Sequence, residues 1–223
     1  SSTNNLHSSL KVFQLSKKFS APVVYASSAA VYGNLPKGDD KKNKFSITSP
    51  YAQDKLTVEH FAKTFFEIYK ISSIGLRMFN VYGAGQTASS PYSSVIPKFI
   101  KRMQNSIPIT INGGFQTRDF IYIDDVIFLM IKSMKKIQGV KSSGTFNLCT
   151  GRSVRVDFLF NLIKKNIGLN SKVIRKKLDN FDPKKSSGNS NKILKFLNLK
   201  KYNFTTLENG LAATINNARN TGL

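Results

Sequence analysis

Two neighbouring stretches decide the fold of this chain: Val23-Val24-Tyr25-Ala26-Ser27-Ser28 and, after a loop, Ser49-Pro50-Tyr51-Ala52-Gln53-Asp54-Lys55. The apolar run at 23–26 is typical of a strand buried on both faces of a parallel sheet. Pro50 suits the first turn of a helix, so the second stretch predicts a helix over 50–70. A predicted helix over 4–19 precedes them, and a predicted strand over 72–79 follows. This alternation predicts an α/β fold with a doubly wound parallel sheet.

The rest of the chain continues with further helices and strands. Apolar spacing predicts helices over 95–105, 126–135, 156–167, 192–199 and 206–218, and strands over 107–111, 120–123 and 144–149. The polar segments 83–93 and 175–191 are predicted loops, and the second of them is basic. We expect Asp124 and Asp125 to cap the helix that begins near Val126.

Tyr51 and Lys55 form a candidate catalytic pair. Residues four apart lie on one face of a helix, and an ammonium favours the phenolate form of a nearby phenol. Tyr51 is therefore a candidate proton shuttle, with the Ser28 hydroxyl arriving from the end of the preceding strand. A lone Tyr-x-x-x-Lys also fits an exposed helix pair, because lysine is abundant in this sequence.

The charge and composition limit the classes of partner. The net charge is +22, but only seven of the 34 basic residues are arginines, and the lysines are scattered along the chain. Proteins that read nucleic acids rely on arginine forks, so we expect no specific nucleic-acid partner. A basic surface still attracts a small anionic substrate. No apolar run reaches about 18 residues, so we expect no membrane span.

The cysteine content and the first residue add two expectations. The single Cys149 cannot form an internal disulfide, which suits the reducing cytoplasm, and we expect no metal site. The sequence begins at Ser1 and not at a methionine, so we expect a fragment of a longer protein or a processed product.

Several motifs in a fixed order carry a resemblance to a known family. Ser27-Ser28-Ala29-Ala30-Val31-Tyr32-Gly33 and the Tyr51–Lys55 helix are followed by 76–83 (LRMFNVYG), 116–126 (QTRDFIYIDDV) and 146–151 (FNLCTG). This series resembles the extended short-chain dehydrogenase/reductases, and among them the NAD-dependent nucleotide-sugar epimerases of the UDP-glucose 4-epimerase type. The resemblance extends from about Asn5 to Gly151.

The resemblance implies a role for each matching position. The implied catalytic residues are Ser28, which holds the sugar 4-oxygen, Tyr51 as the base, and Lys55 as its partner. The implied contacts of the cofactor NAD are Asn5, Ser27, Ser28, Tyr51, Lys55 and Phe79. The implied contacts of a nucleotide-sugar substrate, most simply a UDP-sugar, are Ser28, Tyr51, Asn80, Ser94, Val95, Thr110, Ile111, Asn112, Arg118, Asp182 and Ser186.

For two of these residues, an alternative structural role stays open. Arg118 matches an arginine that binds the diphosphate, and a guanidinium fork to phosphate makes chemical sense, but Arg118 could instead pair with Asp119 or Asp125. Asn80 could be a turn amide whose hydrogen bonds are already satisfied.

Departures from the family pattern narrow the reaction. Related 4,6-dehydratases carry an acidic pair after the serine or threonine, and this sequence has Ala29-Ala30 there, which argues against dehydration. Asp179 stands where the family has a second arginine, so Arg175, Lys176 or Lys184 is expected to supply that phosphate contact. Ser186 occupies the position that limits sugar size, and a small residue there predicts room for an N-acetyl group.

The largest departure is the lack of a Gly-x-x-Gly-x-x-Gly turn for the cofactor. The fold class implied is thus a Rossmann-type sheet without its first βα units, with a smaller mixed α/β substrate domain. We expect residues 1–82 in the cofactor domain and 83–223 mainly in the substrate domain, with 120–136 returning to the first. Without the missing units, residues 23–26 would form an exposed apolar edge.

The expected activity is NAD-dependent epimerisation of a UDP-hexose or UDP-N-acetylhexosamine at C4 through a 4-keto sugar. The alternatives are an incomplete chain that only binds nucleotide sugar, or another oxidoreductase or dehydratase of the same family. The resemblance also implies a homodimer formed through the helices at 4–19 and 50–70.

Overall fold

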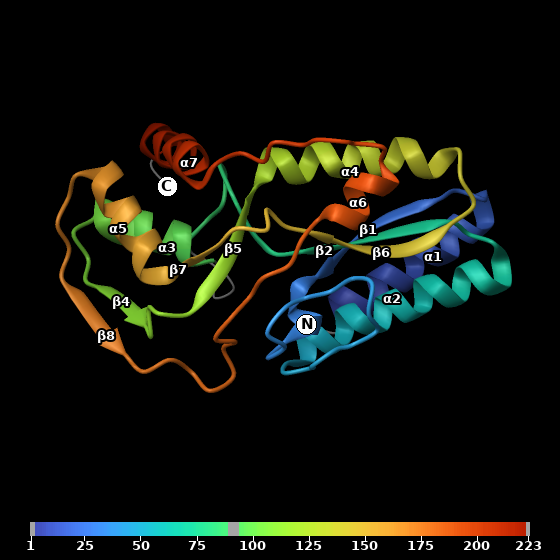
Figure 1. The fold of residues 1–223 in the computed structure, drawn as a ribbon, viewed down its shortest axis with the longest axis horizontal. Coiled ribbons are helices and arrows are strands. Elements are labelled where there is room, and N and C mark those ends of the chain that lie inside the picture. The colour runs from blue at the N-terminus through green and yellow to red at the C-terminus, as the bar shows by residue number, and fades with distance from the viewer. Residues whose placement is uncertain (1–2, 89–93, 222–223) are drawn as a thin grey trace.

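The computed structural model describes residues 3–88 and 94–221 of the chain (Figure 1). Its largest parallel sheet has the strand order β1-β2-β6, formed by β1 (Val23–Ser28), β2 (Ser73–Met78) and β6 (Ser143–Leu148). All six residues of each strand pair in register with the neighbouring strand. The predicted parallel sheet is confirmed, and β1 is an edge strand among the described residues, as expected.

Helices cover both faces of this sheet. α1 (Ser8–Phe19) and α2 (Pro50–Tyr69) contact each other and lie on one face, while α4 (Ile123–Gln138) contacts β1 and β2 from the other (Figure 1). A π-helical turn, η1 (Thr3–His7), precedes α1. α2 begins as the sequence predicts, because Ser49 Oγ accepts a hydrogen bond from Ala52 N at 3.2 Å and Pro50 occupies the first turn.

The chain leaves the sheet at Phe79, which the sequence pattern did not predict. β2 ends at Met78, and β3 (Asn80–Tyr82) pairs with β5 (Thr117–Tyr122) in a second sheet. β5 also pairs antiparallel with β7 (Ser153–Arg155). The apolar pattern continues through both β2 and β3, so it did not reveal the change of sheet. The switch places Phe79 between the two sheets and Asn80 at the start of the second.

The second part of the molecule has its own core. α3 (Val95–Gln104), α5 (Val156–Ile167) and α7 (Leu207–Thr221) pack around residues such as Phe99, Leu159 and Ile163. A third sheet pairs β4 (Ile109–Asn112) with β8 (Val173–Lys176). β8 was not predicted, because all four of its residues are exposed and two are basic. α6 (Asn191–Phe196) packs near β6, and part of the predicted 83–93 loop, residues 89–93, lies outside the described residues.

The predicted capping by Asp124 and Asp125 is wrong in its details. α4 begins at Ile123 with Tyr122 as its N-cap, and no side-chain cap bond is present. Asp125 is buried and accepts hydrogen bonds from Tyr202 Oη at 2.6 Å and Thr205 N at 3.0 Å. It therefore anchors the segment before α7.

Within the described residues, no helix is both long enough and apolar enough to cross a bilayer. The same residues contain no group of three or more His, Cys, Asp or Glu side chains that could hold a metal ion.

Candidate active site

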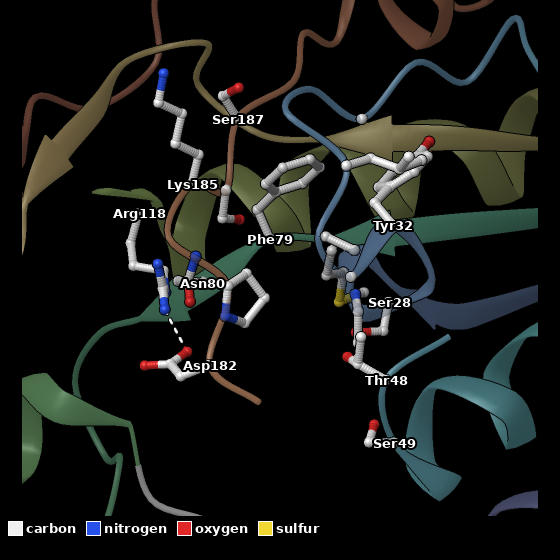
Figure 2. Close-up of a pocket in the computed structure, with 18 of the residues that line it drawn as sticks. Ser28, Tyr32, Thr48, Ser49, Phe79, Asn80, Arg118, Asp182, Lys185 and Ser187 are labelled. Atoms are coloured by element: carbon white, nitrogen blue, oxygen red, sulfur yellow. Dashed lines mark hydrogen bonds and ion pairs between the residues drawn. The ribbon is translucent and has the colours of Figure 1, made fainter. Parts of the chain in front are cut away.

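Two cavities open where the strands of the main sheet end and the second sheet begins. The first, of about 330 Å³, is lined by Ser28, Phe79, Asn80, Arg118 and Ser186, among others (Figure 2). The second, of about 530 Å³, lies between α3, β4 and β5 and shares Asn80, Arg118 and Asp182 with the first. Residues from distant parts of the chain thus form one connected site.

Ser28 lies on the wall of the first cavity at the carboxyl end of β1. It also N-caps the 3₁₀ turn η2 (Ala29–Tyr32), and its Oγ accepts a hydrogen bond from Ala30 N at 3.1 Å. This contact holds the hydroxyl in one orientation while its proton remains available to a substrate oxygen. Ala29 and Ala30 line the same cavity, so these positions contribute no acid or base to it.

Tyr51 and Lys55 lie together on the first two turns of α2. Lys55 Nζ is 5.6 Å from the centre of the Tyr51 ring and donates a hydrogen bond to Ala26 O at 3.1 Å. Tyr51 is 42% exposed and follows Ser49, which lines the first cavity. Burial lowers the pKa of Lys55, and the nearby Asp54 carboxylate opposes this shift. Neither Tyr51 nor Lys55 belongs to the lining of the two cavities, so the catalytic role of the pair stays a prediction.

The other expected cofactor contacts differ in their surroundings. Phe79 is buried in the wall of the first cavity and packs on Tyr32, with ring centres 6.4 Å apart. Asn5 lies in η1, where its Nδ2 is 3.5 Å from an Asp54 oxygen, and it lines neither cavity.

Ser27 does not fit a side-chain contact with the cofactor. Successive strand residues point to opposite faces, and Ser27 is buried with its hydroxyl hydrogen-bonded to Glu59. Its neighbour Ser28 faces the cavity instead. The structure therefore gives Ser27 a partner inside the protein.

Arg118 projects into the site from β5 and is largely buried. It forms an ion pair with Asp182, drawn as a dashed line in Figure 2, and donates to Thr117 O at 2.8 Å. The partner is thus neither Asp119 nor Asp125. Asn80 donates to the Asp119 carbonyl oxygen at 2.9 Å, which satisfies one of its amide protons within β3 and not within a turn.

The loop that carries Asp182 and Ser186 is held against β5 by backbone hydrogen bonds. Thr117 N donates to Lys184 O and Ser186 N donates to Thr117 O, each at 3.0 Å. These bonds hold the loop so that Ser186 lines the first cavity together with Ser28. Ser186 is therefore a lining residue of this cavity, and its effect on sugar size, which the family resemblance implies, stays a prediction.

The second cavity contains the expected nucleotide-contact residues. Its lining includes Ser94, Val95, Thr110, Ile111 and Asn112. It also includes two cations on α3 that the sequence analysis missed, Lys98 and Arg102. Lys98 follows Ser94 by four residues, so helical spacing could have placed it on the same face.

The basic residues proposed for a second phosphate contact lie elsewhere. Arg175 Nη1 is paired with Asp157 at 2.9 Å. Lys176 and Lys184 line a third cavity of about 820 Å³, together with Asp179, and this cavity shares Asp182 with the first two. Arg175, Lys176 and Lys184 are absent from the lining of the cavity that Arg118 shares with Lys98 and Arg102, and a phosphate contact from one of these three residues stays a prediction.

Several known proteins similar to this chain are described as nucleotide-sugar enzymes. A UDP-glucuronate 4-epimerase of Thermodesulfobacterium geofontis is 29% identical over 217 residues, 96% of this chain and 64% of that protein. The human dTDP-D-glucose 4,6-dehydratase is 37% identical over 115 residues, 51% of this chain and 32% of that protein. The chain thus spans from about a third to just under two thirds of the length of these relatives.

Solved structures of the same kind match nearly the whole chain. The UDP-N-acetylglucosamine 4-epimerase of Methanobrevibacter ruminantium M1, in complex with UDP-N-acetylmuramic acid, is 32% identical with a TM-score of 0.89. The match covers 98% of this chain and 70% of the other. The UDP-glucose 4-epimerase of Thermotoga maritima, with UDP-glucose, is 27% identical with a TM-score of 0.89, over 100% of this chain and 71% of the other. In addition, residues 2–149 match the family described as the NAD dependent epimerase/dehydratase family, and the chain belongs to that family.

Proposed function

We propose that the protein containing this chain epimerises a UDP-hexose or UDP-N-acetylhexosamine at C4, with NAD as cofactor. The observation that carries the proposal is the connected site itself. Its first cavity brings together a hydroxyl, Ser28, and a cation, Arg118, with alanines at 29 and 30, and with Ser49, which directly precedes the helix that carries Tyr51 and Lys55. Similar proteins are described as UDP-sugar 4-epimerases and were solved with UDP-sugars, which supports the substrate class.

The proposed reaction assigns one role to each residue. Tyr51 takes the proton of the sugar 4-hydroxyl, and Ser28 holds the same oxygen by a hydrogen bond. Lys55 stabilises the phenolate and keeps two further ammonium protons for hydroxyl groups of the cofactor ribose. When bound, NAD supplies a reversible hydride acceptor. The 4-keto sugar turns in the first cavity, and Tyr51 returns the proton after the opposite face is reduced.

The nucleotide is proposed to lie in the second cavity. Arg118, released from Asp182, would bind the diphosphate through its guanidinium fork. Lys98 and Arg102 add positive charge to the same lining. Ser186 is small, so the first cavity would have room for an N-acetyl group on the substrate. The division into a cofactor region at 1–82 and a substrate region at 83–223, with 120–136 returning to the first, is part of the same proposal.

The surroundings of the catalytic pair fit only one end of NAD. Tyr51, Lys55 and Phe79 suit the nicotinamide ribose and ring, whereas the 223 residues contain no glycine-rich turn for the pyrophosphate. The second candidate function is therefore a chain that binds nucleotide sugar without turnover. This alternative rests on the missing glycine motif.

A dehydratase of the same family is a weaker candidate. The human dehydratase is similar over 115 residues, but loss of water from the sugar requires an acid and a base beside it. The two positions after Ser28 are Ala29 and Ala30, and both line the cavity. A 4-keto-6-deoxy product from UDP-glucose would contradict this argument.

The test uses the purified chain with and without added NAD. Bound NAD is measured by mass spectrometry, and UDP-glucose and UDP-N-acetylglucosamine are followed by separating the epimers. Conversion at C4 supports the epimerase. Tight UDP binding with neither NAD binding nor conversion supports the binding chain.

A homodimer is also proposed. The two helices on one face of the sheet expose large apolar side chains: Val12, Leu15 and Phe19 on α1, and Ile68 and Tyr69 on α2. Exposed apolar residues on neighbouring helices are typical of an interface. A mass of two chains in light scattering would support it, and a monomer at 100 μM would count against it.

A further inference from the structure

A buried ion pair lies beneath the candidate active site and has no role in the reaction proposed above. Arg77 on β2 and Glu59 on α2 are 3% and 7% exposed. Arg77 Nε lies 2.9 Å from Glu59 Oε1, and Nη2 lies 2.6 Å from Oε2. The contact is therefore a two-pronged pair between a sheet strand and the helix that carries the catalytic tyrosine.

The Glu59 carboxylate connects the catalytic helix to the catalytic strand. Glu59 follows Lys55 by four residues and Tyr51 by eight, so the three side chains lie along one face of α2. Its Oε1 also accepts the hydrogen bond of the Ser27 hydroxyl, one residue before Ser28. One carboxylate thus fixes the end of β1 relative to α2.

The Arg77 guanidinium continues these contacts into the loop that follows Ser28. Its Nη1 donates to Tyr32 Oη at 2.8 Å, and Tyr32 Oη donates to Asn147 Oδ1 at 2.7 Å. Burial raises the pKa of Tyr32 to about 12, although Arg77 acts in the opposite direction. The phenol therefore remains protonated at neutral pH and can donate to Asn147.

Asn147 on β6 then holds the loop itself. Its backbone N–H donates to Asp40 Oδ2 at 2.8 Å and its Nδ2 donates to Gly38 O at 3.1 Å. Gly38 N in turn donates to Ser187 O at 2.8 Å, next to Ser186 in the sugar cavity. Hydrogen bonds thus link Glu59, through Arg77, Tyr32, Asn147 and Gly38, to Ser187, which lines the same cavity as Ser28.

Stability alone does not explain such a pair. Removing two charges from water costs several kcal/mol per ion, and well-packed apolar side chains of similar volume often stabilise a protein as well or better. We propose that Glu59 and Arg77 are positioning residues that fix Ser28, Tyr51 and Lys55 relative to one another and hold the 33–48 loop against the sugar cavity. The proposal rests on the proposed function for what the positioned residues do.

The main test replaces both charges with apolar side chains, Glu59→Leu together with Arg77→Met. We expect a melting temperature within about 5 °C of the parent, because no charge is left unpaired. Affinity for UDP should stay within about twofold, since the second cavity is built by other elements. Turnover should fall about 100-fold, the loss typical of a 1 Å displacement of catalytic groups. Glu67→Gln is the matched control, because it breaks the exposed Lys63–Glu67 pair on the same helix and should leave all three quantities unchanged.

Normal turnover in the folded double variant would overturn the proposal. If that variant does not fold, Ser27→Ala and Tyr32→Phe decide the question, because the first removes one hydrogen bond of the set and the second removes two. A fall in kcat at unchanged UDP affinity and melting temperature would support positioning, and an unchanged kcat in both would overturn it.

A measurement without turnover separates this proposal from the proposed function. Backbone hydrogen exchange of the double variant should increase in residues 27–48 and 50–59 and stay at the parent value in α3 and α5. If the parent shows no epimerisation, the proposed function fails, while the exchange result still tests the positioning. Unchanged exchange in both segments would overturn the positioning whatever the activity.

Discussion

Replacing Arg118 by methionine should abolish most of the affinity for UDP. Arg118 is the guanidinium shared by both cavities, and methionine keeps much of its apolar stem. Each charge-assisted hydrogen bond contributes about 1.5–3 kcal/mol, so a two-pronged contact to the diphosphate contributes about 3–6 kcal/mol. Against this, ligand binding breaks the Arg118–Asp182 pair.

Breaking the Arg118–Asp182 pair lowers the contribution of Arg118 to the free energy of UDP binding only slightly. Asp182 has a side-chain exposure of 42%, and pairs that water screens contribute about 1 kcal/mol or less. The net loss is therefore about 2–5 kcal/mol, which is roughly 30-fold to 4,000-fold in Kd at about 1.4 kcal/mol per tenfold. The UDP affinity of Arg118→Lys should lie between those of the parent and of Arg118→Met, because an ammonium keeps the charge but cannot form the fork.

The assay is calorimetric titration with two ligands. UDP should lose affinity by at least 30-fold, whereas uridine, which has no phosphate, should change by less than threefold. Arg175→Met is the matched control, since Arg175 pairs with Asp157 outside this cavity. An Arg118→Met variant that binds UDP within threefold of the parent would refute the diphosphate assignment, and an equal loss for uridine would mean that the cavity itself had been distorted.

Three further substitutions test the chemistry and the fold. Tyr51→Phe should lower kcat by about 10²- to 10⁴-fold, the range for loss of a general base, with UDP affinity unchanged in the same titration; near-normal turnover would rule out the base assignment. Burial lowers the pKa of Lys55, so its charged form costs folding free energy at neutral pH, and that cost diminishes as the pH rises through the lowered pKa. Lys55→Met should therefore melt no lower than the parent at pH 7 while losing turnover, and a clear drop in melting temperature would contradict this. Gly33→Ala should lower the melting temperature by several degrees, because φ is +46° and a Cβ would lie 1.9 Å from Ser46 O; Gly168→Ala, with φ +77° and open space, shows the cost of the backbone strain alone.

Local patterns were sufficient to predict most of the main sheet. Pro50 and the apolar positions after it define α2 within one residue of the predicted range. The run at 23–26 is part of β1, because a strand buried on both faces needs a continuous apolar sequence. Such signals depend only on residues that are close together in the chain, so a single sequence is enough to detect them.

The missed features depend on contacts between distant residues. β8 is basic and exposed, and only its pairing with β4 makes it a strand. The partner of Arg118 is 64 residues away, and no local pattern selects Asp182 over the nearer Asp119. Glu59 and Arg77 were likewise hidden, because a charged residue in an amphipathic pattern usually predicts a solvated face.

In the proposed reaction, the strand switch at Phe79 separates the residues assigned to chemistry from those assigned to nucleotide binding. Ser28, Tyr51 and Lys55 come from β1 and α2 on the main sheet, whereas Ser94, Thr110 and Asn112 come from elements around the other core. Asn80 and Arg118 lie on the paired strands β3 and β5 and line both cavities. Substitutions in the main sheet should therefore change turnover at constant UDP affinity, and substitutions around the second cavity should change UDP affinity first. A substitution at Arg118 is expected to change both, because this side chain lies where the nucleotide and the sugar would meet.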